Sequence, residues 1–239
     1  MEDAKSRLRR VLGNEGLARL DAACVMVVGI GGVGSSCAEA LVRGGVGSLV
    51  FVDGDEVQPS NVNRQAIAFT STVGRRKVGV MAAMAADINP DVRVSTRDGF
   101  VRPEDVPALF AGLPRRPDYV VDAVDTVGTK LALALYAQEA GVSLVASMGG
   151  ANKADPTRLR FADLYETHGD VLSRAMRKQA RAAGIERLEV LYSDEPPLPV
   201  AVPEGTPRSE RPELGTMSYF PPIMGQMLAG RVICRLLGR

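Results

Sequence analysis

The sequence predicts an α/β fold: a doubly wound, Rossmann-like, mostly parallel sheet with a C-terminal antiparallel extension and helices. Three observations predict it. Strand-like and helix-like segments alternate over residues 1–150, as in successive βαβ units. Residues 24–28 are apolar at every position, which is typical of a central parallel strand buried on both faces. A glycine-rich turn, from Gly29 to Gly34, follows that segment and precedes a helical one.

The elements of residues 1–150 are predicted from apolar spacing and from turn residues. Three helices have clear end signals, because Asn89-Pro90 stops one, Pro103 begins another and Gly141 ends a third. In chain order, the predicted elements are a helix at 14–21, a strand at 24–28, a helix at 33–42, a strand at 49–52, a helix at 73–88, a strand at 92–95, a helix at 103–110, a strand at 119–121, a helix at 127–140 and a strand at 142–146.

The alternation loosens in the C-terminal part. Residues 158–161 and 188–192 alternate apolar and polar side chains, which favours antiparallel strands. Residues 194–214 are rich in Pro, Glu and Arg. We expect them to form a mobile loop, because they cannot bury enough apolar area to become ordered.

The last segment, residues 223–237, is apolar but interrupted by Arg231 and Arg235. It is too short to span a membrane as a helix. The pattern predicts a buried helix, and a helix lying on a membrane surface is the alternative.

Composition limits the domain organisation and the partners. The chain has 239 residues, of which 46% are hydrophobic and 24% charged, enough for one domain with a full core. We expect a single domain over residues 1–239, with a nucleotide-binding core at 1–150 and a substrate-side and dimer extension at 151–239. The net charge of +1 creates no global field toward nucleic acid or membrane, so either partner would require a local basic patch.

The three cysteines, Cys24, Cys37 and Cys234, form no CxxC pair, so no zinc is expected. Scattered thiols in apolar surroundings are typical of a reducing compartment, which predicts a cytoplasmic protein. Residues 1–10 lack the apolar core of a signal peptide, and no apolar run is long enough for a transmembrane segment.

The glycine-rich turn predicts a nucleotide site. Gly29, Gly31 and Gly34 have the spacing that permits a tight turn, a close approach of backbone N–H groups to phosphate and close packing of the next helix on the sheet. Gly32 lies between them. The positive end of the following helix adds attraction for an anion. Asp53 ends the second strand, where a carboxylate accepts hydrogen bonds from ribose hydroxyls. The alternative is a glycine turn required only for packing.

The loop after the second strand favours ATP over NAD. An arginine in such a loop can hold phosphate oxygens bidentately and stabilise the charge of a leaving pyrophosphate. The polar residues of this loop are Asp55, Asn61, Asn63, Arg64 and Gln65, and we include Asp55, Asn61, Arg64 and Gln65 among the nucleotide-binding candidates.

Charged residues on two later elements support the same choice. Arg75, Arg76 and Lys77 lie at the predicted start of a helix, where cations are disfavoured, which suggests a nearby anion. A solvated basic turn is the alternative. Asp122 and Asp125 end another strand at the same sheet edge, where two carboxylates can hold Mg²⁺ between phosphates. Asp122 could instead cap the following helix.

In order, the motifs are GIGGVG, VDGDEV, SNVNRQ, GRRKV and DAVDT, within residues 12–150. This series resembles the ubiquitin-activating-like superfamily of ThiF-type adenylating enzymes. The resemblance implies ATP at the glycine turn, ribose at Asp53, phosphates at Asn61, Arg64 and Lys77, and Mg²⁺ or the attacked phosphate near Asp125. It implies attack of a carboxylate on the α-phosphorus of ATP, with Arg64, Lys77 and Asp125 as catalytic residues.

The second half of the chain separates two branches of that superfamily. Activators of sulfur-carrier proteins usually carry two CxxC pairs and often a reactive cysteine, and this chain has neither. The segments at 88–90 (INP), 147–151 (SMGGA) and 155–159 (DPTRL) resemble instead the branch of tRNA threonylcarbamoyladenosine dehydratases. There the carboxylate belongs to the threonine of a modified adenosine beside the tRNA anticodon. Ring closure with loss of AMP then needs no enzyme nucleophile.

A tRNA partner requires a positive surface. Arg174, Arg177, Lys178 and Arg181 recur at three- and four-residue spacing, so they would share one face of a helix. Such a face can neutralise backbone phosphates, and a solvated helix face is the alternative. His168, the only histidine, is a weaker candidate for proton transfer.

The resemblance also implies a homodimer in which an N-terminal arginine reaches the partner's ATP site, with Arg7, Arg9 and Arg10 as candidates. Sulfur-transfer proteins are further candidate partners.

Three functions stay open. An ATP-dependent tRNA dehydratase is favoured, adenylation of the C-terminus of a ubiquitin-like sulfur carrier is the second, and an NAD-binding oxidoreductase or nucleotide-sensing module is the third.

Overall fold

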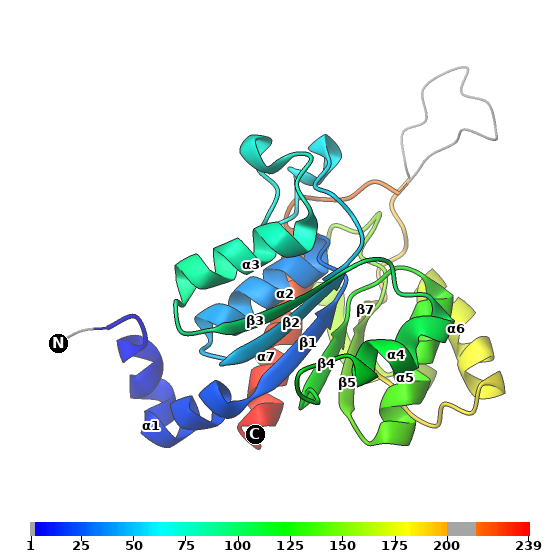
Figure 1. Cartoon of the computed structure of the whole chain (residues 1–239). Helices are drawn as coiled ribbons and strands as arrows, with labels where there is room; N and C mark the ends of the chain where they lie inside the picture. The colour runs from blue at the N-terminus through cyan, green and yellow to red at the C-terminus, as the bar shows by residue number, and fades with distance from the viewer. Residues whose placement is uncertain (1–2, 200–213) are drawn as a thin grey trace.

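The described part of the chain, residues 3–199 and 214–239, contains one seven-stranded sheet in this computed structural model (Figure 1). The strands are β1 (Cys24–Val28), β2 (Ser48–Asp53), β3 (Arg93–Asp98), β4 (Tyr119–Asp122), β5 (Ser143–Ser147), β6 (Leu159–Asp163) and β7 (Glu189–Ser193). Their order is β3-β2-β1-β4-β5-β7-β6, and all neighbours are parallel except β6 and β7. The direction of winding reverses between β1 and β4, which is where ligands bind in such sheets.

Helices cover both faces of the sheet (Figure 1). They are α1 (Ser6–Ala22), α2 (Gly32–Arg43), α3 (Lys77–Ile88), α4 (Val106–Ala111), α5 (Val127–Ala140), α6 (Val171–Ala182) and α7 (Phe220–Leu236). α2, α3 and α7 bury their apolar side chains against one face. α4 and α5 cover the other face, and α6 packs beside α5 over β5 and β7. These layers confirm the predicted doubly wound α/β fold.

Both faces of the central strand are buried, because β1 lies between two layers of helices. Val25 and Val27 pack toward α2 and α7, whereas Met26 and Val28 pack toward α4 and α5. Each of these side chains is almost completely removed from water. The uninterrupted apolar pattern of residues 24–28 therefore predicted the strand with its observed bounds.

The C-terminal helix α7 is buried, as predicted. Phe220, Met224 and Leu228 are inaccessible to solvent and belong to the main core. Gly225 permits a close approach of α7 to α2, because a Cβ atom on Gly225 would lie 2.3 Å from the carbonyl oxygen of Val33. No helix in the described residues is long and apolar enough to cross a membrane.

Several predicted bounds are wrong. The helix predicted at 73–88 begins at Lys77, because Thr70–Thr72 forms a 3-10 turn and Arg76 has a non-helical conformation. The helix predicted at 14–21 is the second half of α1, which starts at Ser6 and is kinked at Gly13, where φ is 68°. In both cases the start of the helix depends on a turn or kink, which the spacing of apolar residues does not predict.

The C-terminal strands are antiparallel to each other but not to the rest of the sheet. β7 pairs antiparallel with β6 and parallel with β5, so the prediction of antiparallel strands holds for one of the two neighbours of β7.

The helix predicted at 103–110 is divided into a 3-10 turn, Pro103–Asp105, and α4. Most of the predicted mobile loop at 194–214 lies outside the described residues, and that prediction stays untested.

Candidate active site

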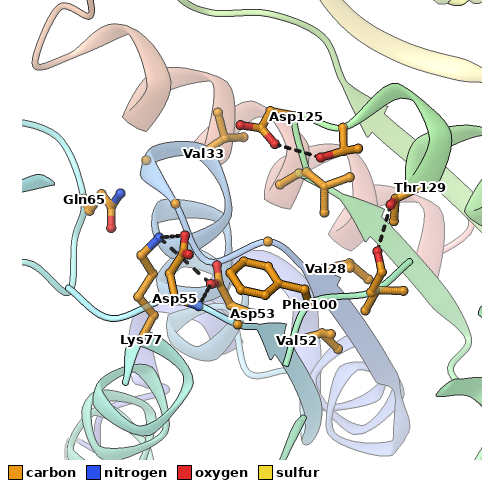
Figure 2. Close-up of a pocket in the computed structure, with 18 of the residues that line it drawn as sticks. Val28, Val33, Val52, Asp53, Asp55, Gln65, Lys77, Phe100, Asp125 and Thr129 are labelled. Carbon is orange, nitrogen blue, oxygen red and sulfur yellow. Dashed lines mark hydrogen bonds and ion pairs between the residues drawn. The ribbon is translucent and has the colours of Figure 1, made fainter. Parts of the chain in front are cut away.

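A cavity of about 600 Å³ opens at the carboxyl ends of β1, β2 and β4, where the winding reverses (Figure 2). Most of the predicted site residues line it. These are Gly29, Gly31, Gly32, Asp53, Asp55, Asn61, Arg64, Gln65, Lys77 and Asp125. Among the predicted cofactor-binding residues, Gly34 and Asp122 do not line the cavity.

The glycine-rich turn depends on the absence of side chains at two positions. Gly29 has a φ of 90°, and a Cβ atom there would lie 2.7 Å from the carbonyl oxygen of Ala123. A Cβ atom on Gly34 would lie only 1.7 Å from the carbonyl oxygen of Gly29. Gly34 thus packs the start of α2 against the turn, in agreement with the packing role predicted for this motif, while its place among the cofactor-binding residues stays a prediction.

Asp53 connects this turn to the end of β2. Its Oδ2 accepts a hydrogen bond from the Ile30 N–H at 2.6 Å, and its Oδ1 accepts one from the Asp55 N–H at 2.8 Å. Carboxylate oxygens hold more than one hydrogen bond each, so Asp53 keeps acceptor capacity toward the cavity. This position suits recognition of ribose hydroxyls.

Lys77, the first residue of α3, directs a cation into the cavity (Figure 2). Only 5% of the residue is exposed. Its Nζ lies 2.7 Å from Asp55 Oδ2 and 3.9 Å from Asp53 Oδ1. A desolvated ammonium group at this place can stabilise phosphate charge more strongly than it could in water.

Arg64 is held in place by its own loop. Its guanidinium donates to the Ser60 carbonyl oxygen at 3.0 Å and to Asn63 Oδ1 at 2.8 Å. Asn61 uses its Oδ1 to accept from the Gln58 N–H at 3.0 Å, which shapes the same loop. A guanidinium fixed in this way keeps further donors for phosphate oxygens.

Gln65 brings a buried acceptor to the cavity. The residue is 7% exposed, and its Oε1 has no hydrogen-bond partner among the residues described. Leaving a buried acceptor unsatisfied costs about 1–3 kcal/mol, which favours a ligand that supplies a donor. Gln65 is predictable as a site residue from its place in the loop alone.

The basic residues before α3 are not equivalent. Arg76 forms an ion pair with Asp98 and donates to the Gly54 carbonyl oxygen at 2.7 Å. Asp98 raises the pKa of Arg76 above its usual value. Arg75 is exposed and lies outside the cavity. Of this basic turn only Lys77 reaches the site, so the suggestion of a phosphate at Arg75 and Arg76 is wrong.

The two carboxylates after β4 have different surroundings, which corrects the prediction that both meet the cofactor. Asp122 is completely buried, and Lys130 Nζ lies 2.9 Å from its Oδ2. Burial raises the pKa of Asp122 while the ammonium of Lys130 opposes that shift. Asp125 is exposed, lines the cavity and accepts a hydrogen bond from Thr126 Oγ1 at 3.3 Å. Asp122 therefore anchors α5 and does not face a metal ion.

No group of three or more His, Cys, Asp or Glu side chains that could hold a metal ion exists within residues 3–199 and 214–239. Mg²⁺ is often bound by one or two carboxylates together with substrate phosphates. Three carboxylates among the described residues line the cavity, and Asp53 and Asp55 are both paired with Lys77. Asp125 is not paired with Lys77 and fits that kind of site.

Residues far from the motifs also line the cavity, and sequence reasoning missed them. The segment after β3 contributes Phe100, Val101 and Arg102, and the start of α7 contributes Pro221. Phe100 is 74% exposed, which is unusual for an aromatic side chain. No local sequence motif predicts that these residues line the site. The available signal was that parallel strands end at one sheet edge, so the residues after β3 lie near those after β2.

The remaining predicted residues lie outside the cavity. Arg174, Lys178 and Arg181 are exposed on α6, while Arg177 donates to the Thr167 carbonyl oxygen at 2.8 Å and is half-buried. His168 is exposed and contacts the ring of Tyr192 edge-on, with centroids 6.0 Å apart.

The predicted N-terminal arginines lie on α1. Arg9 pairs with Asp3 at 2.9 Å, whereas Arg7 and Arg10 are exposed. Their predicted reach into the ATP site of a second subunit remains a prediction.

Comparison with known proteins adds three findings. The model of the ThiF family matches residues 4–239. The tRNA threonylcarbamoyladenosine dehydratase of Bacillus subtilis (strain 168) is 39% identical over 97% of this chain and 94% of its own length. The protein of the same name from Haemophilus influenzae is 38% identical over 72% of this chain and 65% of its own length.

A solved structure with bound nucleotide is also similar. The crystal structure of Escherichia coli tRNA N6-threonylcarbamoyladenosine dehydratase, TcdA, in complex with ATP has a TM-score of 0.84 and 30% sequence identity. The match covers 96% of this chain and 92% of the other.

Proposed function

Because the chain belongs to the ThiF family, we propose that it uses ATP to adenylate the threonine carboxylate of tRNA threonylcarbamoyladenosine and then closes that group into a ring. The names of the relatives support this substrate. One observation carries the proposal: the cavity brings the glycine-rich turn, Asp53, Arg64 and Lys77 together, which is what ATP requires. The ATP complex of a 30% identical protein of the same fold supports the choice of nucleotide.

The reaction has two steps. In the first, a carboxylate oxygen attacks the α-phosphorus, the bond from that phosphorus to the bridging oxygen breaks, and pyrophosphate leaves. Arg64 and Lys77 stabilise the charge that develops on the phosphates. Asp53 orients the nucleotide through its ribose.

In the second step, a nucleophilic nitrogen or oxygen atom of the same threonylcarbamoyl group loses its proton and attacks the activated carbonyl carbon. The bond from that carbon to the phosphate oxygen breaks and AMP leaves, so the net change is loss of water. An intramolecular attack of this kind needs no enzyme thiol. Cys24 and Cys37 are buried and Cys234 is exposed on α7, and none of the three lines the cavity.

A magnesium ion would be held by Asp125 together with the phosphates of ATP, and it would neutralise phosphate charge. Asp125 lies just before α5, so its carboxylate also benefits from the positive end of that helix. We expect Asp122, which is paired with Lys130, to take no part in that site.

We further propose that the exposed cations of α6 contact the tRNA backbone. The start of α6 lies beside the cavity, because Asp170, which caps the helix, is next to Gly149, and Gly150 lines the cavity. Arg174 and Lys178 are one helical turn apart, about 6 Å along the axis. That distance approaches the spacing of successive phosphates in a nucleic-acid strand.

The proposed assembly and location rest on family resemblance and on the thiols. We propose a homodimer in the cytoplasm, with sulfur-transfer proteins as candidate partners. The three cysteines are free thiols, which fits a reducing compartment.

The test is AMP release from labelled ATP and Mg²⁺ with tRNA that carries or lacks the threonylcarbamoyl group. We expect AMP only with the modified tRNA. No AMP with either tRNA, despite measured ATP binding, would contradict the proposal and favour the C-terminus of a sulfur-carrier protein as acceptor. No binding of ATP at all would contradict adenylation of any acceptor.

A further inference from the structure

Phe100 stands out among the cavity residues. Its side chain is 74% exposed, although most aromatic rings of a folded chain are packed against other apolar groups. It lies on the segment between β3 and Pro103–Asp105, at the mouth of the cavity. An apolar ring kept in water at the edge of a ligand cavity suggests that the ring is covered when the ligand binds.

The backbone places the ring of Phe100 beside Asp53. β2 and β3 are paired up to Asp53 and Asp98, and the Gly99 N–H donates to the Asp53 carbonyl oxygen at 3.2 Å. A Cβ atom on Gly54 would lie 2.8 Å from Phe100 Cγ, so only a glycine at position 54 leaves room for this ring. Figure 2 shows the ring beside Asp53, on the side away from Lys77.

The two ends of the cavity differ in polarity on either side of Asp53. Lys77 lies on one side of Asp53, where we place the phosphates (Figure 2). The other end has an apolar floor whose four members belong to one hydrophobic cluster. They are Val28, Val52, Val101 and Val124. A nucleotide with its ribose at Asp53 and its phosphates at Lys77 therefore has its base between this floor and Phe100.

We propose that Phe100 stacks on the adenine base of ATP and supplies a large part of the affinity for the base. The inference rests on the proposed use of ATP and adds a base-recognising residue to it. Aromatic rings prefer to contact other π-systems in stacked or edge-on arrangements. Because every base has a π-face, stacking distinguishes nucleotides from free polyphosphate and not adenine from guanine.

The first test compares Phe100→Ala with Phe69→Ala, a control that also truncates an exposed phenylalanine but lies outside the cavity. Affinities for ATP and for inorganic tripolyphosphate are measured by calorimetry. We expect Phe100→Ala to weaken ATP binding on the order of tenfold and to leave tripolyphosphate binding unchanged. Phe69→Ala should change neither. Equal ATP affinity in the Phe100→Ala variant and the unchanged protein would overturn the proposal.

A second pair of variants separates stacking from simple apolar cover. Phe100→Trp should restore ATP affinity, whereas Phe100→Leu should restore only part of it, because leucine has no π-face. Full restoration by leucine would overturn stacking. If Phe100→Ala raises the KM for tRNA and leaves ATP affinity unchanged, the ring serves the RNA and the inference is wrong. Normal ATP binding without AMP release would instead overturn the proposed function.

Discussion

Asp53 and Asp55 have the same side chain and lie two positions apart, yet their surroundings differ. The Asp53 side chain is 9% exposed and accepts hydrogen bonds from two backbone N–H groups. The Asp55 side chain is 50% exposed and is paired with Lys77. Asp53 is therefore rigid and suited to positioning a ribose, whereas Asp55 can exchange its partner when phosphate approaches Lys77.

At the same scale, Arg64→Ala should lower AMP formation by at least a hundredfold, because we propose that its guanidinium, which the loop holds at the cavity, donates to the phosphates. Arg75→Ala is the matched control, since Arg75 is exposed outside the cavity. The measurement is AMP release under saturating modified tRNA, with unfolding curves to show that both variants are folded. Comparable rates for the two variants would remove Arg64 from the catalytic role.

At the scale of elements, β4 and α5 are joined by a buried ion pair. Asp122, the last residue of β4, and Lys130, in α5, are both inaccessible to solvent. Lys130 also donates to the Val124 carbonyl oxygen at 3.1 Å, and the Val124 N–H donates to Asp122 Oδ1 at 3.2 Å. The pair thus shapes the turn that presents Asp125 to the cavity.

Breaking this pair should cost stability. Lys130→Met leaves the Asp122 charge buried without a partner, and we expect a loss of about 3–5 kcal/mol in the free energy of unfolding. The double change Asp122→Leu with Lys130→Met should recover most of that loss, because no isolated charge is left. Urea unfolding measures both. An unchanged unfolding free energy for Lys130→Met would show that the pair does not hold the two elements together.

Tyr119, at the start of β4, links this strand to β7. Its hydroxyl donates to Glu189 Oε2 at 3.4 Å, and burial, followed by the charge of Glu189, raises its pKa to about 12. The unfolded chain loses this proton near pH 10, so the free energy of unfolding falls as pH rises from about 10 to about 12.

We expect Tyr119→Phe to lose less stability than the unchanged protein between pH 9 and pH 11, by about 1 kcal/mol, because pH 11 lies about one unit above the pKa of the unfolded chain and below that of the folded one. Urea unfolding at the two pH values measures this difference. Parallel losses for the two proteins would mean that Tyr119 does not titrate differently in the folded state.

At the scale of the whole molecule, distant parts of the chain meet at one sheet edge. The glycine-rich turn, the segment after β3 and the start of α7 all line the cavity. A Cβ atom on Gly32 would lie 2.9 Å from Pro221 Cβ, so α7 packs directly against the turn. α6 extends the charged surface away from this cavity.

The α6 surface leads to a prediction about salt. Changing Arg174 and Lys178 together to Ala should reduce the slope of log affinity for tRNA against log salt by about 2, one for each lost phosphate contact. Arg19→Ala with Arg43→Ala is the control pair, because these arginines are paired within α1 and α2. Filter binding over a salt series measures the slopes. Equal slopes for both pairs would place the RNA elsewhere.

The sequence by itself determined the class of fold and predicted most of the residues that line the cavity. Apolar runs such as residues 24–28 report burial directly, because a strand covered on both faces needs apolar side chains at every position. The glycine residues of the turn predict its geometry, because a close backbone approach such as that of Gly34 to Gly29 leaves no room for a Cβ atom. Both are local properties, so a local pattern predicts them.

Only the tertiary structure decided which of the charged residues line the cavity. The sequence placed both Asp122 and Asp125 among the cofactor-binding candidates. The contact of Asp122 with Lys130, formed when α5 packs on the sheet, leaves only Asp125 at the cavity. Arg76 is likewise diverted from the cavity by Asp98 on β3, and Phe100 reaches it through strand pairing. Ion pairs and cavity walls depend on residues distant in the chain, whose proximity no local pattern records.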